Sequence, residues 1–258
     1  MKTNRQKRSK NKGFAEIFGT HAVQAALQNP NRIHQKLFVS QNQKENLDKS
    51  ITKIVPEINE LHSKEMFKMF GSDISHQGIV LRTSKLTQPN LGNILIDSKN
   101  SKNDIIIMLD QVTDPNNIGS IMRSCALLNC NSIIVSNDNA PQITATMAKA
   151  ASGAIEIVNY ISVVNLSRAI LQLKKNDYWI YGLDSHQKLD NDNNLDLPSK
   201  CVLVFGSEGK GLRNLTKKEC DQLISIPIKK NEEYNIESLN VSNACSIALY
   251  EHFKNYNY

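Results

Sequence analysis

The sequence has no long apolar run. Its longest uninterrupted apolar stretches, such as 105–109 and 202–205, are far shorter than the roughly 18 residues that a membrane-spanning helix requires. No apolar signal segment opens the chain either, so we expect a cytoplasmic protein without a membrane partner. The 258 residues are 40% hydrophobic and 22% charged, a composition that suits one large globular domain or two smaller ones.

Patterns for metal binding, nucleophilic catalysis and phosphate binding are also missing. The five cysteines lie in apolar segments, and neither a Cys-x-x-Cys pair nor a histidine cluster has the spacing of a zinc site. Histidine and acidic residues form no recognisable catalytic triad, and the chain lacks a Walker loop. We therefore expect reduced core cysteines and no metal, and hydrolase or triphosphatase activity is unsupported.

The net positive charge is confined to the first twelve residues. Six of the 31 basic residues lie in 1–12, which contain no acidic residue, and this leaves 25 basic against 25 acidic residues in the remainder. Such a segment cannot bury apolar surface, so we expect a disordered basic tail that binds a polyanion by counterion release. RNA or DNA is the natural partner, although a tail for solubility or organelle targeting fits the charge equally well.

Residues 13–83 predict a small α/β domain, because helical and extended patterns alternate along them. Thr20 is expected to cap a helix that runs to about Gln28. Short strands are expected at 36–40, 58–62 and 78–83. The following segment, 84–103, is rich in Ser, Lys, Asn and Asp, and we interpret it as a linker with at most one short helix, at 91–97.

Residues 104–258 predict a second, larger α/β domain. Its strands are apolar throughout, which is typical of parallel strands that are covered on both faces. Five such strands are expected, at 105–109, 132–135, 179–183, 202–205 and 223–226. Helical patterns lie at 118–128, 143–152, 166–175 and 242–254. This order favours a doubly wound or related sheet, which binds ligands at the carboxyl ends of its strands.

Three polar segments follow predicted strands at that edge. Segment 114–119 (DPNNIG) opens a helix that carries Arg123, and by itself it is most simply a well-capped helix start with a surface arginine. Segment 206–211 (GSEGKG) lets backbone groups approach a ligand, but it also suits a flexible turn. In segment 237–242 (ESLNVS), Ser242 is expected to cap the last helix, which leaves Ser238 and Asn240 without a capping role.

Together and in this order, the three segments resemble the signature motifs of the SpoU branch of the SPOUT methyltransferase superfamily. The first domain, with EIFGTHAVQAAL at 16–27 and His76-Gln77-Gly78 near its end, resembles the L30e-like substrate-binding domain found in many of these enzymes. The resemblance implies a SPOUT α/β domain with a deep trefoil knot over 104–258 and an RNA-binding L30e-like domain over 13–83. It also implies S-adenosylmethionine as methyl donor and a homodimer formed through the catalytic domains.

The resemblance also assigns residues of this chain to the site. The catalytic positions are Asn117, Arg123, Glu208, Ser238 and Asn240. The cofactor-binding positions are Gly206, Ser207, Gly211, Ile226 and Leu239. We expect Arg123 to stabilise negative charge and to clamp a ribose or phosphate, because a guanidinium rarely loses its proton near neutral pH. Segment 229–235 is longer than is usual in the family.

The most similar branch of the family implies a particular reaction, methylation of a guanosine ribose in the peptidyl-transferase region of large-subunit ribosomal RNA. A 2'-hydroxyl target requires RNA and not DNA. Two other functions stay open, namely the same chemistry on transfer RNA and a non-catalytic role in RNA binding or ribosome assembly. A Rossmann-type methyltransferase is disfavoured, because no glycine-rich turn follows the strand at 105–109.

Overall fold

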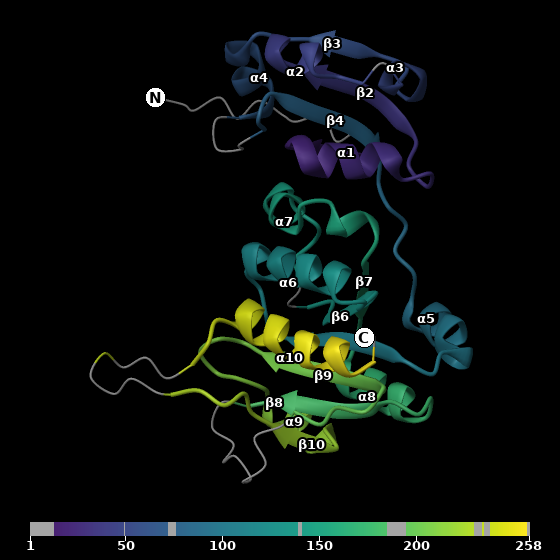
Figure 1. The fold of residues 1–258 in the computed structure, drawn as a ribbon, viewed down its shortest axis with the longest axis vertical. Helices are drawn as coiled ribbons and strands as arrows, with labels where there is room; N and C mark the ends of the chain where they lie inside the picture. The colour runs from purple at the N-terminus through teal and green to yellow at the C-terminus, as the bar shows by residue number, and fades with distance from the viewer. Residues whose placement is uncertain are drawn as a thin grey trace. The chain divides into compact units, whose positions relative to one another are not determined.

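The computed structural model describes residues 13–48, 50–71, 76–138, 141–184, 195–229, 234 and 238–256. The chain divides into two compact units between Thr87 and Gln88 (Figure 1). The basic segment 1–12 lies outside the described residues, as does most of segment 229–235, so the expectations for both segments stay predictions.

A four-stranded mixed sheet forms the first unit, in the order β1-β4-β2-β3, with only β2 and β3 parallel. The strands are β1 (Phe14–Phe18), β2 (His34–Val39), β3 (Ile58–Glu60) and β4 (Ile79–Ser84). The helices are α1 (Thr20–Gln28), α2 (Gln41–Glu45), α3 (Ile51–Ile54) and α4 (Ser63–Phe70). Leu37 and Leu81 pack with α1 on one face, while Phe18 and Phe38 make edge-to-face contacts with Phe70 of α4.

The start of α1 differs from its prediction. Gly19, with φ of 90°, occupies the N-cap position, and no side chain of the helix start caps α1. The backbone N–H of Thr20 donates instead to Gln77 Oε1 at 3.0 Å, so a residue 57 positions away satisfies the helix terminus. The predicted cap by Thr20 is therefore wrong, because a tertiary contact takes its place.

A six-stranded, fully parallel sheet forms the second unit, in the order β10-β8-β9-β5-β6-β7. Its strands are β5 (Asp104–Asp110), β6 (Ser132–Ser136), β7 (Asn159–Val163), β8 (Trp179–Leu183), β9 (Lys200–Gly206) and β10 (Gln222–Ile224). Its α-helices are α5 (Leu91–Asp97), α6 (Pro115–Leu127), α7 (Ala145–Ala151), α8 (Leu166–Lys174), α9 (Asn214–Glu219) and α10 (Val241–Tyr256). The predicted α/β class with a parallel sheet is confirmed.

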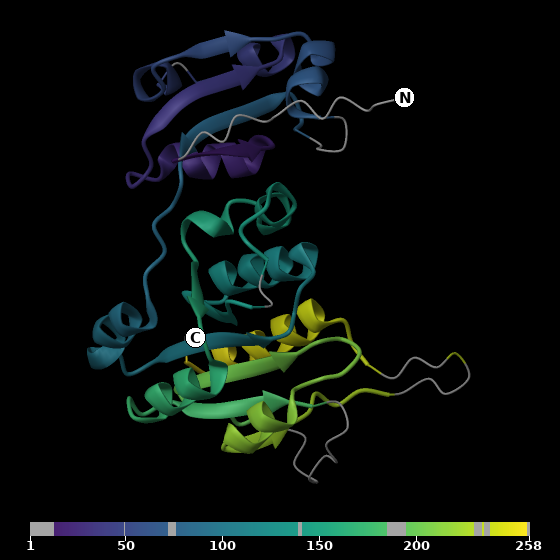
Figure 2. The ribbon, with the colours of Figure 1, turned by 180° about the vertical axis from the view of Figure 1, so that it is seen from behind.

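Both faces of this sheet are buried, as the apolar strands require. Ile107 and Leu109 face α6, α7 and α10, while Ile106 and Met108 face α5 and α8 (Figure 1). Figure 2 shows the second unit from behind, with α8 in front of the sheet. Because every strand runs in the same direction, the carboxyl ends of β5, β8, β9 and β10 lie along one edge, where the site forms.

The segment interpreted as a linker, 84–103, is more ordered than expected. Helix α5 occupies 91–97, the position foreseen for one short helix. Its Leu91 and Ile94 are buried in the core of the second unit, beneath the sheet face that also packs on α8. Much of this segment therefore belongs to the second unit, because two apolar side chains on one face of α5 gain from burial.

Candidate active site

Three polar side chains from three different segments form one hydrogen-bonded cluster. Asn117 of α6 donates from Nδ2 to Glu208 Oε1 at 2.8 Å. Asn240, which directly precedes α10, donates from Nδ2 to the same Glu208 oxygen at 2.7 Å and to Asn117 Oδ1 at 3.0 Å. All three residues had been assigned to the site from sequence, and the fold brings them together at the carboxyl edge of the sheet.

Asn240 also caps the last helix. Its Oδ1 accepts hydrogen bonds from the backbone N–H of Ser242 at 2.9 Å and from the Ser242 hydroxyl at 2.6 Å. The prediction that Ser242 is the cap is therefore wrong, since Asn240, two residues earlier, performs this role. A single amide thus uses its oxygen to hold the helix and its nitrogen to hold the cluster, so the position of α10 and the position of Glu208 are linked.

The loop that carries Glu208 closes tightly on itself. Gly211 donates from its backbone N–H to the Ser207 carbonyl at 2.8 Å, and the two residues form an isolated antiparallel bridge. Gly211 has a φ of +64°, in the left-handed region that favours glycine. A Cβ atom at Gly206 would lie only 2.1 Å from the Gly211 carbonyl carbon, so the close approach requires glycine there.

A buried ion pair anchors the end of this loop to β5. Asp110, whose side chain is 0% exposed, is the last residue of that strand. Its carboxylate accepts from the backbone N–H of Arg213 at 3.1 Å, from Arg213 Nε at 2.7 Å and from the Thr216 hydroxyl at 2.7 Å. These bonds tie the loop of the second motif to the strand that leads into the first motif.

Removing this anchor should destabilise the second unit. We expect Asp110→Ala to lower its free energy of unfolding by about 2 to 3 kcal/mol, because the buried Thr216 hydroxyl and the Arg213 N–H groups lose their acceptor. Urea denaturation followed by the fluorescence of Trp179, the single tryptophan of the chain, reports on this unit. Glu251→Ala, which breaks the more exposed pair with Lys254, is the control and should change stability by less than about 0.5 kcal/mol. Equal denaturation midpoints for the two variants would contradict the anchor.

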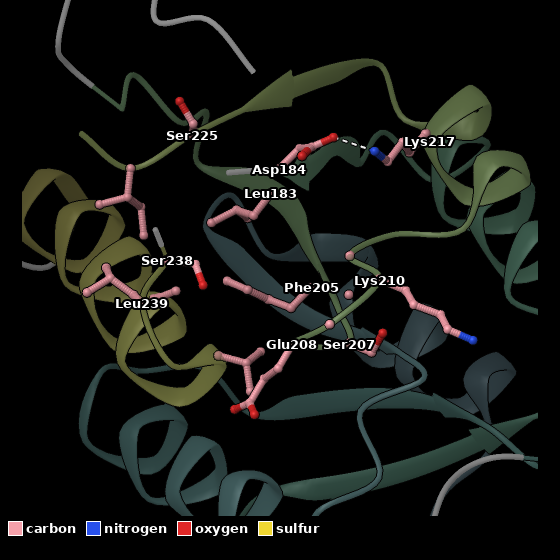
Figure 3. A pocket seen from close by; sticks show the side chains of 16 residues that line it. Leu183, Asp184, Phe205, Ser207, Glu208, Lys210, Lys217, Ser225, Ser238 and Leu239 are labelled. Atoms are coloured by element: carbon pink, nitrogen blue, oxygen red, sulfur yellow. Dashed lines mark hydrogen bonds and ion pairs between the residues drawn. The ribbon is translucent and has the colours of Figure 1, made fainter. Parts of the chain in front are cut away.

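A cleft of about 290 Å³ opens beside the cluster, beyond the carboxyl ends of β8, β9 and β10 (Figure 3). Seven residues that had been assigned from sequence line it, namely Gly206, Ser207, Glu208, Gly211, Ile226, Ser238 and Leu239. Phe205 and Leu183 supply apolar surface, and Glu208 lies at one side of Phe205. The cleft therefore combines an apolar wall with glycine backbone and a polar end, which suits an organic ligand with both apolar and polar parts.

Arg123 stands apart from the other assigned residues. It is exposed on α6, two turns beyond the helix start, and it does not line the cleft. Among the described residues, its side chain has neither a hydrogen-bond partner nor an ion-pair partner. Its six-residue separation from Asn117 corresponds to about 9 Å along the helix axis. Its guanidinium is therefore available to a ligand that extends beyond the cleft.

The cysteines do not offer a nucleophile. All five are free. Burial raises the pKa of the Cys220 thiol to about 12, and it also raises the pKa of Cys125, Cys201 and Cys245 above the usual thiol value. These four thiols are protonated at neutral pH, so they are weak nucleophiles and metal ligands. Among the described residues, no group of three or more His, Cys, Asp or Glu side chains could hold a metal ion.

Two features of the site were not foreseen from the sequence. One is the Asp110–Arg213 anchor, and the other is an ion pair at the rim of the cleft between Asp184, which follows β8, and Lys217 of α9. The available signal was the acidic residue that directly follows two of the predicted apolar strands, 105–109 and 179–183, at 110 and 184. A carboxylate at the edge of the sheet where ligands bind either needs a partner for its buried charge or contacts a ligand.

Comparison with known families supports a single assignment for both units. Residues 104–250 match the SpoU rRNA Methylase family, and residues 17–89 match the family described as RNA 2'-O ribose methyltransferase substrate binding. The enzyme named 23S rRNA (guanosine-2'-O-)-methyltransferase RlmB from Photobacterium profundum is 33% identical over 242 residues, which are 91% of this chain and 95% of that protein. The protein of the same name from Haemophilus influenzae is 32% identical, over 92% of this chain and 96% of its own.

Solved structures share the fold. The SpoU methyltransferase AviRb from Streptomyces viridochromogenes, in complex with the cofactor AdoMet, superposes with a TM-score of 0.74 at 20% identity, over 98% of this chain and 94% of that one. The AdoMet-bound rRNA methyltransferase from Sinorhizobium meliloti gives a TM-score of 0.72 at 19% identity, over 95% and 88%. The family matches of the two units, together with the fold, define a methyltransferase with a substrate-binding unit. The chain belongs to the SpoU rRNA methylase family.

Proposed function

We propose that this protein transfers a methyl group from S-adenosylmethionine to the ribose 2'-hydroxyl of a guanosine in large-subunit ribosomal RNA. The observation that carries the proposal is the Asn117–Glu208–Asn240 cluster at the mouth of a cleft on the carboxyl edge of the sheet. The names of relatives that are 32–33% identical over nine-tenths of the chain support guanosine and 23S-type RNA as the substrate.

The residues of the cleft fit S-adenosylmethionine. The close packing of Gly206 against Gly211 leaves backbone in place of side chains along the floor, and Phe205 and Leu239 offer apolar contact for a purine. Gly206, Ser207, Gly211, Ile226 and Leu239 would hold the cofactor. When bound, it supplies a methyl group that is already activated by the positive charge of its sulfonium, so no metal is needed for this chemistry.

The chain has to act on the other reactant, the ribose hydroxyl. This group is a very weak acid, so negative charge that develops on its oxygen must be stabilised while its proton passes to solvent. Arg123 of α6 would supply the positive charge and hold a neighbouring phosphate. Asn117 would orient the ribose, while Glu208 holds Asn117 and Asn240 by accepting their N–H groups. Ser238 would order the cofactor loop.

The two functions of Asn240 can be separated by one substitution. Asn240→Asp retains an oxygen that caps α10, but it removes both N–H donors of the cluster and places a second carboxylate beside Glu208. We expect methyl transfer to fall about ten- to hundredfold, as loss of two hydrogen bonds and charge repulsion imply. The unfolding midpoint should change little, because the cap remains and because Glu208 and Asn240 are exposed, so that water replaces the lost hydrogen bonds and screens the repulsion. Single-turnover methylation and thermal unfolding measure the two effects.

Asn165→Asp provides the matched control. Asn165 caps α8 by accepting from the Arg168 backbone N–H at 2.9 Å, and it lies outside the cluster. This variant should retain both activity and stability. Wild-type turnover by Asn240→Asp would remove the cluster from the proposed mechanism, and equal loss of turnover in the two variants would show a general effect of the substitution.

The proposal also includes one feature of each unit's fold. The first unit, over about 13–83, is L30e-like and binds RNA, and residues 104–258 form a catalytic domain with a deep trefoil knot. The return of α10 from the edge strand β10 to pack on α6 and β9 is compatible with a threaded carboxyl end. Pulling the unfolded chain by its ends tests the knot, because a trapped knot makes the extended length shorter than the contour length.

Assembly and compartment complete the proposal. A homodimer would cover apolar side chains that are exposed on the adjoining helices α6 and α10, namely Leu127 at 71%, Ile247 at 40% and Tyr250 at 52%. Leu249 of α10 is buried in the core, so it is not part of this exposed apolar surface. Sedimentation velocity should give twice the 29.0 kDa mass of one chain.

Five free thiols and a ribosomal substrate suit the cytoplasm. None of the helices in the described residues is long and apolar enough to span a membrane.

The decisive experiment is transfer of labelled methyl from S-adenosylmethionine to unmodified large-subunit ribosomal RNA and to transfer RNA, followed by mapping of the modified ribose. Labelling of one ribosomal guanosine is the expected result. Labelling of transfer RNA alone would replace the proposed substrate by its nearest rival. Absence of labelling on both RNAs and on ribosome assembly intermediates would favour a non-catalytic RNA-binding role.

A further inference from the structure

A charged pair closes the end of the cleft that lies away from the polar cluster. Lys217 Nζ is 2.5 Å from Asp184 Oδ2, and both side chains line the cleft. Only 11% of the Asp184 side chain and 30% of the Lys217 side chain are exposed. Figure 3 shows the pair on the opposite side of Phe205 from Glu208. The cleft thus has two polar ends with an apolar wall between them.

The position of Asp184 is fixed by the sheet and not by a loop alone. It directly follows β8, and its backbone N–H donates to the carbonyl of Ile224 in β10 at 2.9 Å. Lys217 belongs to α9, whose start is held by the buried Asp110 through Arg213 and Thr216. Both members of the pair are therefore held by ordered elements, which gives a ligand a preorganised contact.

The chemistry of the pair selects the kind of ligand group that fits. The Asp184 carboxylate only accepts hydrogen bonds, and the Lys217 ammonium only donates them. A hydroxyl satisfies both, since its hydrogen can donate to the carboxylate while its oxygen accepts from the ammonium. Two vicinal hydroxyls can each make these hydrogen bonds. Because hydroxyls are neutral, the charges of the carboxylate and the ammonium still balance each other. A carboxylate at the end of a strand in an open α/β sheet commonly binds the ribose of a nucleotide in this manner.

We propose that Asp184, held by Lys217, binds the ribose diol of the S-adenosylmethionine adenosine. This inference rests on the proposed function, which places the reacting end of the cleft at Glu208. Asp184 is then a cofactor-binding residue, and Lys217 is the positioning residue that orients its carboxylate. The apolar stretch formed by Phe205 and Leu183 lies between this ribose contact and the polar cluster (Figure 3).

Binding measurements with modified cofactors test the contact without relying on turnover. Isothermal titration calorimetry compares S-adenosylhomocysteine with its 2'-deoxy and 3'-deoxy analogues on wild-type protein, Asp184→Asn and Lys217→Met. We expect Asp184→Asn to weaken S-adenosylhomocysteine about ten- to hundredfold, since it removes a charged hydrogen-bond acceptor. At least one deoxy analogue should bind wild type and Asp184→Asn equally, because the group that Asp184 contacts is absent from it.

A neighbouring lysine supplies the control, and two results would overturn the inference. Lys218→Ala removes an exposed ammonium of α9 that does not line the cleft, so its affinities should equal those of wild type. Unchanged affinity of Asp184→Asn for S-adenosylhomocysteine would contradict the ribose contact. Equal weakening for S-adenosylhomocysteine and both deoxy analogues would assign Asp184 a structural role only. Wild-type protein that binds none of these compounds would instead contradict the proposed function, and this inference with it.

Discussion

Arg123→Ala should lower the rate of methyl transfer on the order of 100- to 1000-fold, the effect of removing one preorganised donor that stabilises a developing negative charge. Binding of S-adenosylhomocysteine should stay at its wild-type affinity, because Arg123 does not line the cleft. Stability should also be unchanged, since this exposed side chain has no hydrogen-bond or ion-pair partner among the described residues. Single-turnover methylation, calorimetry and thermal unfolding measure the three quantities.

Two further variants sharpen this expectation. Arg123→Lys keeps the charge but loses the planar fork that holds two oxygens at once, so it should recover only a small part of the lost rate. Arg168→Ala removes an exposed arginine from α8, on the opposite face of the sheet, and should turn over as wild type. If Arg123→Lys turns over at the wild-type rate, Arg123 acts only as a point charge. If Arg123→Ala turns over at the wild-type rate, Arg123 does not belong to the catalytic centre.

The interior of the second unit was largely predictable from the sequence. Strands β5, β6, β8 and β9 are buried on both faces, so their apolar runs identified them. Strand β7 was missed because it lies at the sheet edge and buries only Tyr160 and Ile161 within NYISV. Strand β1, which pairs only with β4, was missed for a similar reason. An edge strand has a mixed pattern of polar and apolar residues, and its identity comes from the neighbour with which it pairs.

The site was predictable as a set of segments but not as a set of bonds. Three polar segments at strand ends had to meet at one edge of a parallel sheet, and their order suggested the family. The bond between Asn117 and Glu208 joins residues 91 positions apart, and the contact between Asp110 and Arg213 joins residues 103 positions apart. No local pattern encodes such pairings, because they depend on strand order and on the closure of the loop after β9. The capping role of Asn240 was missed because Ser242 is an equally good local candidate.

Closure of that loop requires a glycine at 206 as well as at 211, and Gly206→Ala should weaken cofactor binding strongly because its added methyl group meets backbone. The new Cβ would lie 2.1 Å from the Gly211 carbonyl carbon and 2.3 Å from the Leu212 nitrogen, and both are backbone atoms that cannot move without opening the loop. We expect a strain of about 3 kcal/mol, the upper part of the range for overpacked sites. When the loop must close to bind the ligand, this strain lowers the affinity for S-adenosylhomocysteine about 100-fold.

Gly209→Ala is the matched control, because it adds the same methyl group to the same loop at a position with no atom within 4 Å. Its affinity for S-adenosylhomocysteine and its Trp179 unfolding midpoint should equal those of wild type. A difference between the two variants isolates the close approach of Gly206 to Gly211 from any general sensitivity of the loop. Equal and unaltered affinities would mean that the loop opens without cost, so that the Ser207–Gly211 bridge does not shape the floor of the cleft. Equal losses in both variants would mean that the added methyl groups act through loop flexibility or through the ligand itself, because Gly209 also lines the cleft.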